Sequence, residues 1–297
     1  MKNGGPRVLF VYKKSAYQLH VRERKNGRVE ELIRRGDRTV QNVLSADAEH
    51  VETLEEARAA VRDLGVRGVF RYRSDEGLVE GFDLIVAIGG DGTLLWVSHR
   101  VPPGVPVLAV NSAPGHSVGH FCGGQKGRVR DALEAAIGGK LKASRLTRMQ
   151  VELDGEVLSR RVLNDALFCH ASPAATTRYI VSLHGIDEAQ KSSGLWIGPA
   201  AGSTAAQRSA GGRVLPPASR KLQYVVREPY HAPEGQYRLR RGLVDEREEL
   251  VVASQIRAGR LFLDGPHLVH EVDLGQVVRF RRSDEPLTLL AFPRASG

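Results

Sequence analysis

The sequence contains few of the residues that define several classes of protein. Only two of its 297 residues are cysteine, Cys122 and Cys169, too few for a disulfide framework or a cysteine-ligated zinc site. Both are expected to be buried, reduced thiols. The ten histidines form neither an HExxH pattern nor a close pair, so no metal bound by the protein itself is expected.

Long apolar runs are also missing. Runs such as residues 84–88 and 105–110 have the length of a strand, whereas a membrane-spanning helix needs about 20 apolar residues. Near the N-terminus, the apolar stretch from Val8 to Tyr12 is too short for a secretory signal and too strand-like for a transit peptide. The sequence therefore predicts a cytoplasmic protein that does not bind membranes.

Aromatic residues make up only 6% of the chain, while the formal net charge is +9. Such a charge is typical of proteins that bind nucleic acid, anionic membranes or polyphosphate ligands. The basic residues are mixed with acidic ones, apart from runs at 238–241 and 279–282, and few aromatics are available to stack on bases. Nucleic acid is therefore not expected as a partner, and two interpretations stay open: a solvated basic surface and a basic cleft that attracts phosphate.

Two patterns of hydrophobicity divide the chain. Up to about residue 121, short all-apolar segments alternate with helical ones, which is typical of a parallel sheet covered on both faces. A capping box from Thr53 to Glu56 predicts the start of one of these helices. The expected strands are 7–12, 66–72, 83–88 and 105–110, and the expected helices are 17–35, 53–63, the segment after Thr93, and 128–137.

Beyond about residue 146, segments of alternating polarity are separated by Gly, Pro and Asp turns, which predicts antiparallel strands. The expected fold class is α/β, with an N-terminal Rossmann-like parallel-sheet domain and a β-rich, sandwich-like C-terminal domain. The first domain is expected to span residues 1–121, with residues 283–297 returning to it. The second is expected to span residues 122–282.

The strongest local motif is Gly89-Gly90-Asp91-Gly92-Thr93, which follows an apolar strand and precedes an apolar helical segment. Ligands of open parallel sheets bind beyond the carboxyl ends of the strands. Glycines let the backbone approach a phosphate, and the helix that follows directs its first N–H groups at the anion. A carboxylate there is unfavourable unless it accepts a proton or holds Mg²⁺. The alternative is an ordinary Asp/Gly turn, since the motif is neither a Walker loop nor a GxGxxG fingerprint.

This motif is shared by NAD kinases, diacylglycerol and sphingosine kinases, and 6-phosphofructokinases, but the rest of the chain resembles only the NAD kinases. Asn164-Asp165 is similar to the family's Asn-Glu pair, which holds adenosine. Residues 202–205 and 209–212 resemble its GSTAY loop, and residues 263–265 resemble its VDG turn. The resemblance implies the family's fold, with an α/β domain of the diacylglycerol kinase type.

The resemblance is narrower still, to the divergent mitochondrial-type NAD kinases and their bacterial counterparts. It is carried by Asn111 to Pro114, Gly119 to Cys122, Gln190 to Leu195 and Arg227 to Pro229. The chain departs from the common pattern in Asp165, which replaces a glutamate, and in Ala206, which replaces the tyrosine of GSTAY.

The implied function is transfer of the γ-phosphate of ATP to the 2′-hydroxyl of the adenosine ribose of NAD or NADH. The resemblance implies Asp91 as the general base, and Gly89, Gly90, Gly92 and Thr93 as the turn that holds the triphosphate with Mg²⁺. The other residues that it assigns to ligand binding are Asn111, Asn164, Asp165, Lys191, Ser193, Gly202, Ser203, Thr204 and Ala205.

Several alternatives stay open at this stage. The chain could phosphorylate another hydroxyl acceptor, such as a lipid or a sugar, or bind dinucleotides without catalysis. Ser203 and Thr204 could cap a helix that begins at Ala205, and Lys191 could be a solvated loop charge. The family resemblance implies NAD(H) and ATP as ligands and a homodimer or homotetramer. The choice between NAD and NADH, and between ATP and other phosphate donors, stays open.

Overall fold

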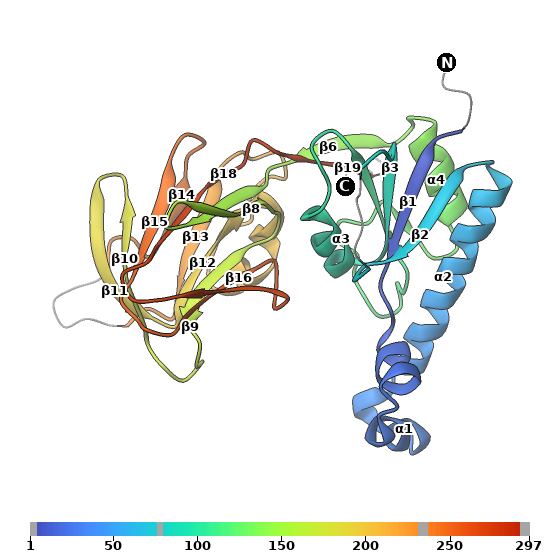
Figure 1. The fold of residues 1–297 in the computed structure, drawn as a ribbon, viewed down its shortest axis with the longest axis horizontal. Coiled ribbons are helices and arrows are strands. Elements are labelled where there is room, and N and C mark those ends of the chain that lie inside the picture. Colours follow the sequence, from blue (N-terminus) through green and yellow to red (C-terminus); the bar gives the residue numbers. More distant parts are fainter. Residues whose placement is uncertain (1–4, 76–79, 231–236, 292–297) are drawn as a thin grey trace. The chain divides into compact units, whose positions relative to one another are not determined.

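The computed structural model describes residues 5–75, 80–230 and 237–291. It divides into two compact units, one of residues 1–144 and 288–297 and one of residues 145–287 (Figure 1). The sequence had placed the boundaries earlier, after residues 121 and 282. Residues 122–144 belong to the first unit because the helix within them, α4, contacts helix α2 and shares its hydrophobic cluster.

The first unit is built on a mostly parallel sheet with the strand order β2-β1-β3-β4-β19-β6, and β5 pairs with β4. Its strands are β1 (Arg7–Tyr12), β2 (Arg67–Tyr72), β3 (Leu84–Gly89), β4 (Pro106–Asn111), β5 (Gly124–Gln125), β6 (Lys142–Leu146) and β19 (Leu287–Ala291). Strand β3 is buried at every position, as expected for a sheet covered on both faces. All four strands expected in this region are present. The apolar run expected to return to this sheet ended at Phe292, which lies outside the described residues.

The helices of this unit are η1 (Gln18–Glu23), α1 (Gly27–Arg34), η2 (Arg38–Val40), α2 (Val43–Asp63), α3 (Asp91–Ser98) and α4 (Val129–Ile137). Helix α1 contacts η1 and η2, whereas α2, α3 and α4 pack on the sheet. Helices α2 and α4 share one hydrophobic cluster with alternate residues of β1, β3 and β4. Helix α3 contacts β3 and β4 from the other side and buries Leu94 and Val97 there (Figure 1).

The helix expected to begin at Thr53 begins ten residues earlier, at Val43, so the prediction of its start was wrong. Thr53 is fully buried in the middle of α2, and its hydroxyl lies 2.8 Å from the Glu49 carbonyl and 3.0 Å from the Ser112 carbonyl. A hydroxyl that bonds back to the preceding turn is compatible with a helix interior. The Ser/Thr-x-x-Glu pattern at Thr53 therefore does not mark the start of a helix. Its threonine instead bonds to the residue that follows β4.

The helix expected over residues 17–35 is interrupted. Lys25 adopts a left-handed conformation with φ +48°, and Asn26 accepts hydrogen bonds from the backbone of the first turn of α1. The interruption separates η1 from α1. None of the described helices is long and apolar enough to cross a membrane.

The second unit consists of two antiparallel sheets with the orders β11-β10-β15-β18-β7-β8 and β14-β13-β12-β9-β16-β17. Their strands are β7 (Met149–Leu153), β8 (Glu156–Val162), β9 (Ala166–His170), β10 (Thr177–Leu183), β11 (Ile186–Ser192), β12 (Gly194–Pro199), β13 (Leu222–Arg227), β14 (Arg241–Val244), β15 (Glu249–Ser254), β16 (Gly259–Leu263), β17 (Leu268–Val272) and β18 (Val277–Arg282). Two short helices, η3 (Ala200–Thr204) and α5 (Ala206–Ser209), follow β12.

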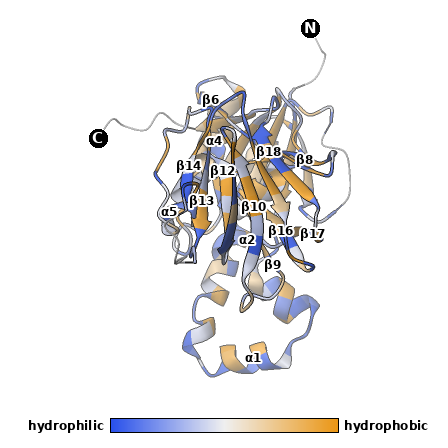
Figure 2. Ribbon diagram, turned by 90° about the vertical axis from the view of Figure 1, so that its left-hand side faces the viewer, coloured by the Kyte–Doolittle hydropathy of each residue, from blue (hydrophilic) through white to orange (hydrophobic). Residues whose placement is uncertain are grey.

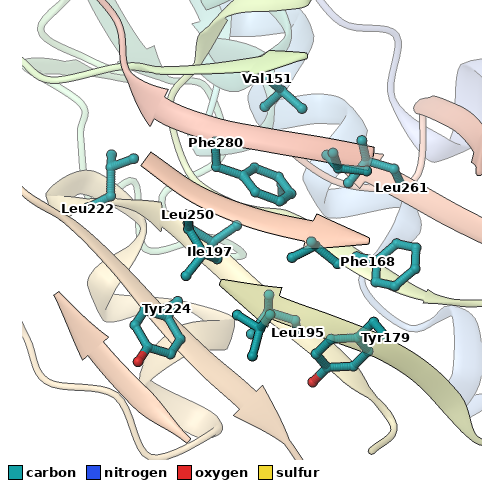
Figure 3. Close-up of a cluster of buried hydrophobic side chains, with 14 of the residues drawn as sticks. Val151, Phe168, Tyr179, Leu195, Ile197, Leu222, Tyr224, Leu250, Leu261 and Phe280 are labelled. Carbon is teal, nitrogen blue, oxygen red and sulfur yellow. The ribbon is translucent and has the colours of Figure 1, made fainter. Parts of the chain in front are cut away.

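Both sheets contribute to one hydrophobic core. Hydrophobic and hydrophilic residues both occur along the strands (Figure 2), and in β10 every second side chain is buried. Phe280 and Tyr179 from one sheet and Phe168 and Ile197 from the other belong to one buried cluster (Figure 3). This packing of two sheets confirms the sandwich-like fold expected from the alternating segments.

Candidate functional site

The GGDGT turn joins β3 to α3 in the first unit. Gly90 has φ +152°, a conformation that residues with a side chain rarely adopt, so the turn requires glycine there. The backbone N–H groups of Thr93 and Leu94 both donate to the Gly90 carbonyl and close the first turn of α3. A Cβ at Gly89 would lie 2.1 Å from the Thr93 hydroxyl, so the side chain of Thr93 packs over a bare backbone.

Asp91 is the first residue of α3, and its carboxylate is bound to a loop. One oxygen accepts the backbone N–H of His120 at 2.8 Å, and the other accepts that of Phe121 at 2.9 Å. These bonds fix the orientation of the carboxylate beside the turn. The thiol of Cys122 lies nearby: burial and the charge of Asp91 raise its pKa to about 12, which keeps it neutral. Cys122 and Cys169 are free and half-buried.

The predicted ligand residue Asn111 ends β4, the strand next to β3. Its amide oxygen accepts hydrogen bonds from the Ala113 backbone at 3.2 Å and the Ser117 hydroxyl at 2.8 Å, and its nitrogen donates to the Ser117 carbonyl at 2.8 Å. Asn111 therefore shapes the loop that carries the Asp91 partners. It also lines a pocket of about 290 Å³, together with Cys122, Arg128 and other residues of the first unit.

In the second unit, the Asn164-Asp165 turn precedes β9. The carboxylate of Asp264 accepts the backbone N–H groups of Leu163, Asn164 and Asp165 at 2.8, 2.7 and 3.1 Å. The Asn164 side chain donates to the Asp165 carboxylate at 2.8 Å. Hydrogen bonds to a charged acceptor are roughly twice as strong as bonds between neutral groups. The three bonds to the Asp264 carboxylate therefore hold this turn firmly in place.

Asp165 is 5% exposed. Burial, with a contribution from the charge of Asp264, raises its pKa to about 7. Arg148, which is fully buried, lies close enough to Asp264 for the two charges to interact, and burial lowers the pKa of Arg148 to about 10. Asp165 therefore changes its protonation state near neutral pH.

The GSTA segment lies against the Asn164-Asp165 turn. A Cβ at Gly202 would lie 1.7 Å from the Asn164 carbonyl oxygen, so only glycine fits. Ser203 is fully buried: its hydroxyl donates to the Ala200 carbonyl at 2.6 Å and accepts the Leu215 N–H at 2.9 Å. Both of these bonds are internal and hold the loop, and the role of Ser203 in lining the site stays a prediction. Thr204 is exposed.

The capping interpretation of this segment is wrong. Ala205 is the residue that precedes α5, no side chain caps α5, and η3 already includes Ser203 and Thr204. Lys191 is exposed, and its ammonium nitrogen lies 5.9 Å from the centre of the Tyr230 ring. Ser193 bonds through its backbone N–H to the Arg227 carbonyl at 2.9 Å.

Most of the predicted residues thus form two groups, one in each unit. Lys191 and Ser193 belong to neither group, because they lie just before the start of β12 and the GSTA segment follows its end. Gly89 to Thr93 and Asn111 come together around the GGDGT turn, while Asn164, Asp165 and residues 202–205 come together beside β9 and β12. Sequence reasoning noticed Asp264 only as part of the turn at residues 263–265 and gave it no role, because its three bonds go to a segment about 100 residues earlier. Within the described residues, no group of three His, Cys, Asp or Glu side chains could hold a metal ion.

Residues 14–137 match the family model of the ATP-NAD kinase N-terminal domain. A protein of Oryza sativa subsp. japonica described as a probable NADH kinase is 32% identical over 268 residues, which cover 82% of each chain. This chain belongs to the NAD kinase family. An NADH kinase of Arabidopsis thaliana is 33% identical over 231 residues, covering 70% of this chain and 72% of its own.

Solved structures of the NAD kinase family have the same fold. An NAD kinase from Archaeoglobus fulgidus in complex with ATP aligns with a TM-score of 0.67 at 18% identity, covering 95% of this chain and 92% of its own. Yeast NADH kinase complexed with NADH also aligns with a TM-score of 0.67. The identity is 16%, and the alignment covers 98% of this chain and 85% of the yeast chain. At these identities, the likeness establishes the shared architecture alone.

Proposed function

We infer that this protein is an NAD(H) kinase that transfers the γ-phosphate of ATP to the 2′-hydroxyl of the adenosine ribose. The observation that carries this inference is the GGDGT turn with Asp91 fixed beside it, in a chain of the NAD kinase family. Membership of the NAD kinase family disfavours a kinase that acts on a lipid or a sugar. The intact Asp91 disfavours a protein that binds dinucleotides without catalysis. Similarity to the plant NADH kinases also supports the mitochondrial-type branch and NADH as the preferred acceptor.

Each group of residues has a distinct part in this reaction. Phosphoryl transfer depends mainly on positioning the donor and acceptor and on neutralising the phosphate oxygens, part of which Mg²⁺ bound to ATP supplies. The GGDGT turn receives the triphosphate at the N-terminus of α3. Asp91 accepts the proton of the 2′-hydroxyl. Asn164 and Asp165 offer an amide and a carboxyl group to the adenosine. The family resemblance further predicts a homodimer or homotetramer.

The test is a coupled assay of the purified protein with Mg-ATP and either NAD or NADH, in which formation of NADP or NADPH is followed enzymatically. We expect turnover with both acceptors and a higher kcat/KM for NADH. A higher kcat/KM for NAD would contradict the branch assignment. Turnover of neither acceptor would refute the proposed activity, and dinucleotide binding measured by calorimetry would then distinguish a silent binder from a kinase of another acceptor.

The raised pKa of Asp165 predicts a pH dependence of dinucleotide binding. With a pKa of about 7, its carboxyl group is protonated below that pH and ionised above it. If the ionised form accepts hydrogen bonds from the dinucleotide, KM for NADH should rise about tenfold between pH 8 and pH 6. In Asp165→Asn this dependence should disappear, and in Asp264→Asn the midpoint should move to lower pH. An unchanged pH profile in Asp165→Asn would assign the dependence to another group.

The same shift affects stability. The carboxyl group of Asp165 in the unfolded chain loses its proton near the ordinary aspartate pKa of 3.8, whereas in the folded protein it keeps its proton to about pH 7. The contribution of Asp165 to the free energy of unfolding therefore declines as the pH rises from about 4 to about 7, and the cost of burying its charge is fully present above that range.

A further inference from the structure

The strand register places two cations in line with the GGDGT turn. The last residue of β1 pairs with the last residue of β2 and with the residue before Gly89 in β3. The next residues, Arg73, Lys13 and Gly89, therefore follow one another across the carboxyl edge of the sheet, and Gly89 pairs with Asn111 of β4. Backbone bonds continue this register beyond the strands. Ligands of such sheets bind at this edge.

The side chain of Lys13 lies along the turn. A Cβ at Gly89 would be 3.3 Å from Cδ of Lys13, so the aliphatic part of the lysine passes over the same bare backbone that faces Thr93. The Thr93 hydroxyl is buried and has no hydrogen-bond partner among the described residues. His50 holds the backbone at this point, since its Nε2 lies 2.7 Å from the Lys13 carbonyl.

Among the residues that the structure describes, Lys13 has no counter-ion. Its ammonium group forms no ion pair or hydrogen bond with any residue that the structure describes, and the same holds for the guanidinium of Arg73. Burial, and secondarily the charge of Arg73, lower the pKa of Lys13. The adjacent Lys14 differs, because it pairs with Glu23 at 2.6 Å and lies over the Tyr72 ring. Two unpaired cations beside a phosphate-binding turn favour an anionic ligand.

We propose that Lys13, with Arg73 beside it, binds the terminal phosphate groups of the nucleotide donor at the GGDGT turn. This inference rests on the proposed function, in which a nucleoside triphosphate is the donor. The lysine ammonium contacts non-bridging phosphate oxygens, and the unpartnered Thr93 hydroxyl donates to the same phosphate chain. Sequence reasoning missed Lys13, because a lysine after a first strand is unremarkable until the register places it beside Gly89.

The test compares Lys13→Met with Lys14→Met, which removes the neighbouring charge, and with Lys13→Arg. Calorimetry measures the Kd of the magnesium complex of a non-hydrolysable ATP analogue, the Kd of AMP and the Kd of NADH. We expect Lys13→Met to raise the Kd of the triphosphate analogue by about 10- to 100-fold. The Kd values of AMP and NADH should stay within about twofold, Lys14→Met should match the wild type, and Lys13→Arg should recover part of the loss.

Equal effects of Lys13→Met and Lys14→Met would overturn the proposal, as would an equal loss of triphosphate and NADH binding, which indicates a structural role. If Lys13→Met does not fold, a second experiment uses the wild-type protein. Its lysines are acetylated chemically with and without the triphosphate analogue, and the modified residues are identified by mass spectrometry. The triphosphate analogue should then protect Lys13 and leave Lys14 unprotected, and unprotected Lys13 would refute the proposal. Lys13-dependent triphosphate binding without phosphorylation of NAD or NADH would instead contradict the proposed function alone.

Discussion

Replacing Asp91 with asparagine is expected to lower kcat by about 100- to 10,000-fold, the usual contribution of a positioned general base. The amide cannot accept the proton of the 2′-hydroxyl, although it has nearly the shape of the carboxylate. The Kd of NADH should change little, because Asp91 is tied to the backbone of His120 and Phe121 and belongs to the unit that holds the GGDGT turn. Steady-state kinetics and calorimetry on the same preparation measure both quantities.

Asp91→Asn also weakens the hydrogen bonds to the loop that carries His120 and Phe121. This structural effect must be separated from the loss of the general base. The asparagine nitrogen would face one of the two N–H donors, so one of the two bonds would be lost. The cost is about 1–3 kcal/mol, the penalty for an unsatisfied donor. Melting temperature reports that cost, and Asp63→Asn, which removes an exposed carboxylate at the end of α2, serves as the control. A near-normal kcat for Asp91→Asn would refute the assignment of the base.

Much of the first unit could be predicted from sequence because its signals are local. An apolar strand, a glycine-rich turn and an apolar helix follow one another from Leu84 to Ser98, and each depends on residues adjacent in the chain. The start of α2 at Val43 could not be predicted in this way. The ten residues before Thr53 carry a weak periodicity, and the helix is held by packing against α4 and by a bond to Ser112.

The motifs of the site could be predicted from the sequence, but the hydrogen bonds that hold them in place could not. Asp91 and Asn164 were recognised from their neighbours in the chain, whereas their hydrogen-bond partners come from a loop about 30 residues away and from Asp264, 100 residues away. The structural part of Ser203 was equally hidden from the sequence. Its hydroxyl bonds to Ala200 and Leu215 hold the loop, and its predicted place beside the ligand stays a prediction.

Gly202→Ala should be the most damaging small substitution in the second unit. The added Cβ would lie 1.7 Å from the carbonyl oxygen of Asn164, 2.5 Å from its carbonyl carbon and 3.0 Å from its Cα. These are backbone atoms, so no rotamer change relieves the overlap, and the Asn164-Asp165 turn must move. We expect a loss of about 3 kcal/mol, which lowers Tm by roughly 10 °C, and a rise of more than tenfold in KM for NADH.

Gly27→Ala provides the matched control, since a Cβ at Gly27 meets nothing within 4 Å and its φ is not positive. Its Tm should equal or slightly exceed that of the wild type, because alanine is the better helix former. If Gly202→Ala melts like Gly27→Ala, the close contact with Asn164 does not exist in solution. If it melts lower but binds NADH normally, the Asn164-Asp165 turn tolerates displacement and does not hold the dinucleotide. If Gly202→Ala loses both stability and NADH affinity, two conclusions follow. The close contact of Gly202 with Asn164 exists in solution, and this contact holds the Asn164-Asp165 turn in the position that binds the dinucleotide.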